Sequence, residues 1–173
     1  MPSRSRASAL SSPESRVPSP EVHVGYALSR RGVPAPVSFR RWTAAALQAA
    51  QHRKPALVSI RIVGAREGHA LNWRYRGKDY ATDVLSFPAE LPRGVAVPLL
   101  GDLAICAPIV AKAAREFGLP VRDHYAHLTV HGVLHLLGYD HQNRRDFARM
   151  KALEIRALAS LDIVDPYRSL GVG

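Results

Sequence analysis

The chain has 173 residues and a mass of 18.9 kDa, which suits one domain with a substantial core. Its composition, 47% hydrophobic and 22% charged, excludes a fully disordered chain, and the single cysteine, Cys106, excludes a scaffold held by internal disulfides. A formal net charge of +10 indicates an anionic partner, most often a nucleic acid. No apolar run reaches the roughly 18 residues of a membrane span, so we expect a soluble protein without a membrane partner.

The two ends of the chain are predicted to be tails. Residues 1–20 are rich in serine, proline and arginine and offer almost nothing to bury, so we predict that they are disordered. A transit peptide has a similar composition, but the four prolines oppose the amphipathic helix that such a peptide needs. The folded domain is predicted to span 21–167, and 168–173 form a short C-terminal tail.

Between the tails, hydrophobic periodicity and turn residues predict alternating strands and helices. Strands are expected at 22–28, 56–63, 84–87 and 101–106, and helices at 38–52, 67–75, 108–117, 122–137 and 143–161. Ser38 is the predicted N-cap of the first helix. The apolar face of the last helix is predicted to consist of Phe147, Met150, Leu153, Ala157 and Leu161. This pattern predicts a single α+β domain, in which a small mixed sheet packs with helices and one central buried helix carries the histidines described next.

Three histidines have the spacing of a metal site. His131 and His135 are four residues apart, so on a helix they project from one face. Gly138 can end the helix in a left-handed conformation and return His141 towards them. Three imidazoles fill three tetrahedral positions of Zn²⁺ and leave the fourth open, as in catalytic zinc sites. We therefore predict one Zn²⁺ per chain, in preference to three histidines hydrogen-bonded in a core.

The neighbours of these histidines bear on two further interpretations. His124 and His127 are predicted to lie on the helix surface or to support the ligands. The spacing is also that of zinc proteases with the motif HExxHxxGxxH, whose glutamate is the general base. Gly132 stands at the glutamate position here, so a metallopeptidase-like hydrolase is kept only as an alternative.

Three stretches of the sequence resemble motifs of the YbeY family of bacterial metallo-endoribonucleases. They are HGVLHLLGYDH (131–141), LNWRYRGKDYATDVLSFP (71–88) and LLGDLAIC (99–106). The resemblance runs from about residue 21 to residue 167 and includes DPY at 165–167. Two departures stand out: Ala81 replaces the family's usual proline, and the segment after His141, usually acidic, reads QNRRDFARM.

The resemblance implies a zinc-dependent, single-strand-specific endoribonuclease of the cytoplasm. It implies action on single-stranded RNA, in 3′-end maturation of 16S rRNA and in ribosome quality control, with the ribosome or a ribosomal protein as partner. By the same resemblance His131, His135 and His141 are the zinc ligands, and Arg76 and His131 are the catalytic residues.

The chemistry of these residues agrees with that implication. Phosphodiester cleavage builds negative charge on oxygen, which a Lewis acid and a fixed cation stabilise. The planar guanidinium of Arg76 matches two phosphate oxygens. Residues 38–82 contain nine Lys/Arg and only two acidic residues, Glu67 and Asp79, so the local net charge is +7. This excess of positive charge predicts an electropositive face that binds a polyanion.

Several alternatives stay open at this level. Water or the RNA 2′-hydroxyl could attack the phosphodiester. The metal could instead be structural, in a zinc-stabilised RNA- or ribosome-binding module without catalysis. Asp140, beside the last ligand, either orients an imidazole or is an ordinary turn residue.

Overall fold

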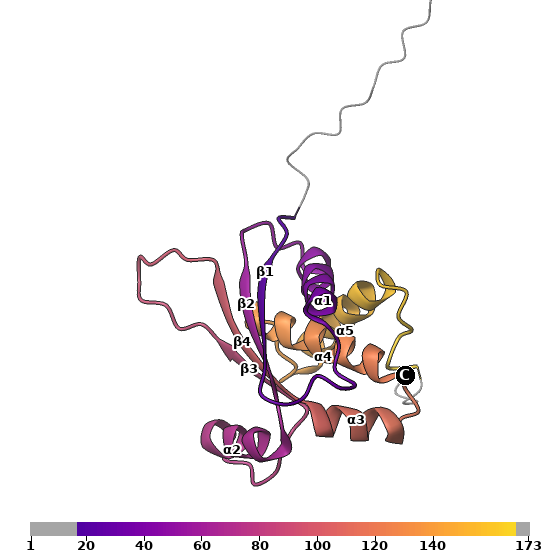
Figure 1. The fold of residues 1–173 in the computed structure, drawn as a ribbon. Helices are drawn as coiled ribbons and strands as arrows, with labels where there is room; N and C mark the ends of the chain where they lie inside the picture. Colours follow the sequence, from indigo (N-terminus) through magenta and orange to yellow (C-terminus); the bar gives the residue numbers. More distant parts are fainter. Residues whose placement is uncertain (1–16, 169–173) are drawn as a thin grey trace, which may run out of the picture.

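A computed structural model describes residues 17–168, so most of the predicted tails 1–20 and 168–173 lies outside the described residues. This part of the chain forms four strands and five helices (Figure 1). In order they are β1 (Glu21–Tyr26), α1 (Pro36–Ala49), β2 (Leu57–Val63), α2 (Ala65–Arg76), β3 (Val84–Pro88), β4 (Leu99–Cys106), α3 (Ala107–Glu116), α4 (Val121–Leu136) and α5 (Arg144–Ala159). Every predicted element is present.

The strands form one mixed sheet in the order β1-β2-β4-β3. β1, β2 and β4 are parallel, and β3 runs antiparallel to β4 at one edge. Alternation in β2 buries Val58, Ile60 and Ile62 on one face, as the sequence predicts. The hairpin from β3 to β4 holds the proline-rich loop at 89–98.

The free edge of β3 is partly occupied by side chains and proline. Alternate residues of an antiparallel edge strand turn their backbone polar groups away from the partner, and here these are Val84, Ser86 and Pro88. The N–H of Val84 donates to Asp83 Oδ1 at 2.8 Å, and the carbonyl of Ser86 accepts from the Arg76 guanidinium at 3.0 Å. Pro88 has no N–H to offer.

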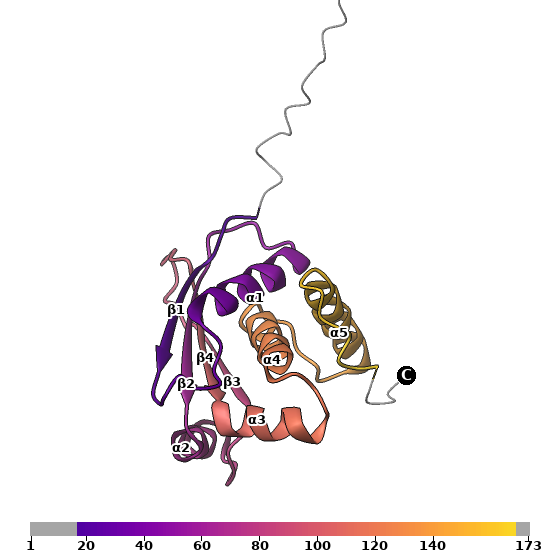
Figure 2. The same cartoon turned by 45° about the vertical axis from the view of Figure 1, so that its right-hand side comes forward.

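Helix α4 lies at the centre of the domain. α1 and α4 pack against one face of the sheet, and α5 packs against both helices on the side away from the sheet (Figure 2). An edge-on aromatic contact joins α1 to α4, with the ring of Phe39 6.1 Å from that of Tyr125. Within α1, the ring of Phe39 also lies 5.1 Å from that of Trp42. The predicted α+β domain with a central buried helix is confirmed. No helix of residues 17–168 is long and apolar enough to cross a membrane.

Two details of the sequence prediction are wrong. α1 begins at Pro36 rather than after a Ser38 cap, because proline at the first helical position has the required φ and needs no hydrogen bond. Phe147 of α5 is 40% exposed rather than part of the core. The buried side of α5 instead combines Met150, Ala157 and Leu158 with a carboxylate, Glu154.

Candidate metal centre

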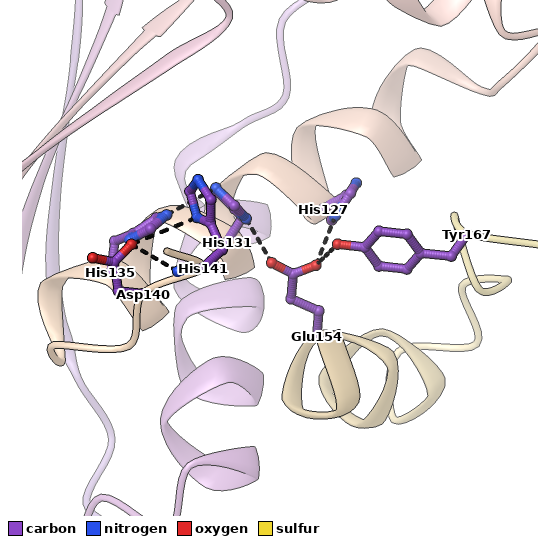
Figure 3. A network of polar contacts seen from close by, with 7 residues as sticks. All are labelled: His127, His131, His135, Asp140, His141, Glu154 and Tyr167. Carbon is purple, nitrogen blue, oxygen red and sulfur yellow. Dashed lines mark hydrogen bonds and ion pairs between the residues drawn. The ribbon is translucent and has the colours of Figure 1, made fainter. Parts of the chain in front are cut away.

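The three predicted ligands come together at the C-terminal end of α4. His131 and His135 lie one helical turn apart, with their Nε2 atoms 3.1 Å from each other. His141 approaches from the loop after α4, and its ring centre lies 5.1 Å from that of His135 (Figure 3). One nitrogen from each of the three rings lies within 4.8 Å of the other two.

The turn that returns His141 is built around Gly138. Its φ of +91° is left-handed, a conformation that glycine adopts without steric cost. The N–H of Gly138 donates to the carbonyl of His135, and the N–H of Tyr139 to that of Leu134, which together form a Schellman motif. Asp140 Oδ1 then accepts the backbone N–H of His141 at 2.7 Å. Asp140 therefore fixes the backbone of the third ligand.

Glu154 of α5 is a component of the site that the sequence analysis missed. Its side chain is 1% exposed, and Oε1 accepts a hydrogen bond from Nδ1 of His131 at 2.6 Å. Its other oxygen faces Nε2 of His127 at 3.1 Å and accepts from the Tyr167 hydroxyl (Figure 3). Burial alone raises the pKa of Glu154, but the hydrogen bonds from His127 and His131 outweigh it and lower the pKa to about 2. Glu154 is therefore a buried carboxylate.

The two upstream histidines differ from each other. His127 contacts Glu154 and so supports a ligand, as one of the two predictions proposed. His124 is 7% exposed and does not lie on the surface, and among the described residues neither of its ring nitrogens has a hydrogen-bond partner. Burial lowers the pKa of His124, which keeps its ring neutral.

The three histidines fit a small transition-metal ion. Ligand atoms of a tetrahedral zinc lie about 3.3 Å apart when Zn–N is roughly 2.0–2.1 Å, close to the observed Nε2 separation of His131 and His135. Because Nδ1 of His131 donates to Glu154, its Nε2 lone pair faces the other two rings. Burial, with His131 and His141 nearby, lowers the pKa of His135 to about 4, so this imidazole is neutral as a ligand must be.

Gly132, at the position of the protease glutamate, is closely packed against the sheet. It lies where α4 crosses β4, and a Cβ there would be 2.8 Å from Cδ2 of Leu103 and 3.3 Å from Oγ of Ser86. A side chain at position 132 would therefore require the buried Leu103 side chain to shift. The protease-type base itself is absent from the sequence, because residue 132 is a glycine.

Arg76 lies in the same pocket as the histidines. It ends α2, and its contact with the Ser86 carbonyl brings the guanidinium along the edge of β3. The pocket has a volume of about 520 Å³ and is lined by Arg76, by β3 and by all three histidines. The neighbouring Arg74 is not among the lining residues, and its guanidinium lies 5.4 Å from the ring centre of Tyr75.

The basic residues of 38–82 do not form the single face that the sequence predicts. They are divided between α1 with the turn after it and α2 with its flanks, and these parts lie at separate ends of the domain (Figures 1 and 2). Arg61 is also paired with Glu67 at 2.7 Å. The net charge of +7 counted over residues 38–82 therefore overstates how many of these basic side chains can contact one bound polyanion.

We predict that Glu154→Gln protein binds metal about 10- to 100-fold more weakly, the usual cost of removing the partner of a ligating histidine. The substitution removes the negative charge of the carboxylate. It also places an amide N–H₂ group opposite His127, His131 and Tyr167, which donate hydrogen bonds to the carboxylate. Competition with a chelating dye measures the change. Glu116→Gln, the same substitution in an exposed pair with Lys112, serves as the control and should leave metal affinity unchanged. Equal affinities for both variants would contradict a supporting role for Glu154.

Several known proteins are similar to this chain. A protein-family model described as "Endoribonuclease YbeY" matches residues 34–162. Relatives with the same description from Stenotrophomonas maltophilia (strain K279a) and Xanthomonas campestris pv. campestris (strain B100) are 58% and 56% identical over 151 residues, or 85% of this chain and 92% of theirs. A solution structure from Thermotoga maritima has a similar fold, with a TM-score of 0.52 and 24% identity over 83% of this chain and 91% of that one.

Proposed function

This chain belongs to the YbeY family of endoribonucleases, and from that membership we propose that it is a zinc-dependent enzyme that cuts single-stranded RNA. We further propose that it matures the 3′ end of 16S rRNA and acts in ribosome quality control in the cytoplasm, with the ribosome or a ribosomal protein as partner. The net charge of +10 supports a polyanionic substrate.

The observation that carries the proposal is the shared pocket of Arg76 and the three histidines. One wall offers one nitrogen from each of three imidazoles, and another offers a guanidinium. Zinc is favoured among metals because the donor set is all nitrogen, three-coordinate and open on one side. When bound by His131, His135 and His141, the ion supplies a Lewis acid that stabilises negative charge on a phosphodiester oxygen.

Neighbouring residues orient Arg76 and two of the histidines. One N–H of Arg76 is held by Ser86, which orients the planar guanidinium, and its other donors can bind two oxygens of the scissile phosphate. Glu154 holds the ring of His131 in one tautomer, and Asp140 holds the backbone of His141. The site is therefore organised before substrate binds, which lowers the cost of reorganisation during the reaction.

Two features weigh against the metallopeptidase alternative. Position 132 holds a glycine instead of the glutamate base of such proteases, and a larger side chain there would have to displace Leu103. Extended peptides also commonly bind by adding a strand to a free sheet edge. The edge beside this pocket is β3, where Asp83 occupies the N–H of Val84, Arg76 occupies the carbonyl of Ser86, and Pro88 lacks an N–H.

One experiment separates the three candidate functions. Zinc-loaded protein is mixed with a single-stranded RNA, its duplex, and an unstructured peptide. We expect cleavage of the single strand only, and no cleavage by His131→Ala protein. Cleavage of the peptide would favour the peptidase, whereas RNA binding without cleavage would favour the zinc-stabilised binding module.

We predict that RNA affinity is largely electrostatic. The log of the association constant should fall with the log of salt concentration by about 0.7 per phosphate contact, between about 50 and about 200 mM salt. Arg76→Ala should reduce the slope by roughly one contact, while Arg115→Ala, on a helix that contributes nothing to the pocket, should not. Fluorescence anisotropy of a labelled RNA gives both slopes. A slope near zero for the unmodified protein would contradict the prediction.

A further inference from the structure

Phe147 is an exposed aromatic side chain beside the metal centre. It belongs to the first half of α5 and is 40% exposed, although the periodicity of the helix predicts it in the core. Single exposed apolar residues are common and need no explanation by themselves. The position of Phe147 is unusual because the ring lines a cavity that it shares with two of the metal ligands.

This cavity, which we call the α5 pocket, has a volume of about 270 Å³. It is lined by His131, His141, Phe147, Lys151, Glu154 and Tyr167, together with Met150. His131 and His141 also line the pocket of Arg76, so the two cavities meet at the metal centre. The α5 pocket is smaller than the pockets for drug-sized ligands, which begin at about 300 Å³, and so it suits one ring system.

The surroundings of the α5 pocket are basic. Residues 144–151 contain four Lys/Arg against one acid, Asp146, a local charge of +3. Asp146 is engaged at the start of α5, where its carboxylate accepts a hydrogen bond from Asn143. Arg144, Phe147 and Lys151 are spaced three and four residues apart, so they share one face of the helix. Arg149 lies 5.1 Å from the ring centre of Tyr139, which lines the pocket of Arg76.

We propose that the α5 pocket binds the nucleotide next to the scissile phosphate, with its base stacked on Phe147 and its backbone phosphate near Arg144 and Lys151. This inference rests on the proposed ribonuclease function and extends it, because it gives the RNA strand a contact outside the pocket that holds Arg76. Exposed aromatic rings next to cations are the usual means of binding single strands without reading their sequence. A duplex keeps its bases stacked on each other, so such a subsite also favours single-stranded substrate.

The test measures single-turnover cleavage of a short single-stranded RNA at increasing enzyme concentrations. Phe147→Ala should raise the half-saturating enzyme concentration about 5- to 150-fold, the value of one base–aromatic stack, with a smaller change in the maximal rate. Phe147→Trp should restore tight binding. Phe117→Ala is the matched control, since Phe117 is 52% exposed at the end of α3 and lines neither pocket.

A second arm identifies the stacked base. The same RNA is made with one abasic nucleotide at each position around the cleaved bond. For the unmodified enzyme, an abasic nucleotide at one position next to the cleaved bond should weaken RNA binding as much as Phe147→Ala does. The same abasic RNA should bind the Phe147→Ala enzyme no more weakly than the intact RNA does. Two results would disprove the subsite without affecting the proposed RNA cleavage. In one, the abasic nucleotide weakens binding to the Phe147→Ala enzyme as much as to the unmodified enzyme. In the other, Phe147→Ala and Phe117→Ala have the same half-saturating enzyme concentration. If the unmodified enzyme cuts no single-stranded RNA, the proposed function fails and the subsite fails with it.

Discussion

His135→Ala protein is expected to retain no stoichiometric metal after dialysis against a mild chelator, and to cut RNA at no measurable rate. His135 supplies one of three imidazoles, and its Nε2 lies 3.1 Å from that of His131. Loss of a directly ligating group should exceed the 10- to 100-fold loss of affinity that typically follows removal of a supporting residue. Elemental analysis gives the metal content, where we expect one zinc per unmodified chain and almost none in the variant.

The control for His135→Ala is His23→Ala. His23 is an exposed histidine of β1 that pairs with Glu21, so its loss removes an imidazole without touching the centre. This variant should keep one zinc per chain and full activity. Retention of one tightly held zinc by His135→Ala protein would disprove the three-histidine assignment.

Arg76→Lys is expected to be almost as damaging as Arg76→Ala. Both substitutions remove the planar group that can hold two phosphate oxygens at once, and a lysine offers only a point charge. Losing one such transition-state stabiliser should slow cleavage by about 10²–10³, by analogy with the donors of an oxyanion hole. Single-turnover rates at saturating enzyme measure this loss.

Arg74→Ala provides the comparison for Arg76. Arg74 belongs to the same last turn of α2, but its guanidinium lies near Tyr75, outside the pocket. The Arg74→Ala substitution should weaken RNA binding only modestly. Metal content should stay at the unmodified level in all three arginine variants. A full cleavage rate in Arg76→Ala protein that holds its metal would contradict the catalytic role of Arg76.

The ligand cluster could be predicted from sequence because its geometry is local. The helical repeat fixes the relation of His131 to His135, and Gly138 marks where the helix ends. A window of 11 residues therefore contains all the information needed to bring the three rings together. The strands and helices were predictable for the same reason, since each depends on periodicity within a short segment.

Glu154 could not be assigned in this way because its partner lies 23 residues earlier, on another helix. Which side of α5 faces α4 depends on tertiary packing rather than on local sequence. One signal was nevertheless available. Glu154 follows Met150 by four residues and precedes Leu158 by four, so it interrupts an otherwise apolar face with a carboxylate. An acid in that position has to find buried donors, and the histidines of α4 are such donors.

The contact between Arg76 and the Ser86 carbonyl has a consequence for the solution behaviour of the protein. An unprotected edge strand is a template on which a second molecule can build intermolecular sheet. Along β3 the guanidinium occupies the Ser86 carbonyl, the Asp83 carboxylate occupies the Val84 N–H, and Pro88 has no N–H to offer. The charge on Arg76 should also repel another copy of this cationic chain. If Arg76 holds RNA as proposed, the same side chain would also protect this edge against intermolecular sheet formation. Arg76 variants should accordingly be compared at low protein concentration, where self-association through the uncovered edge does not deplete the active protein.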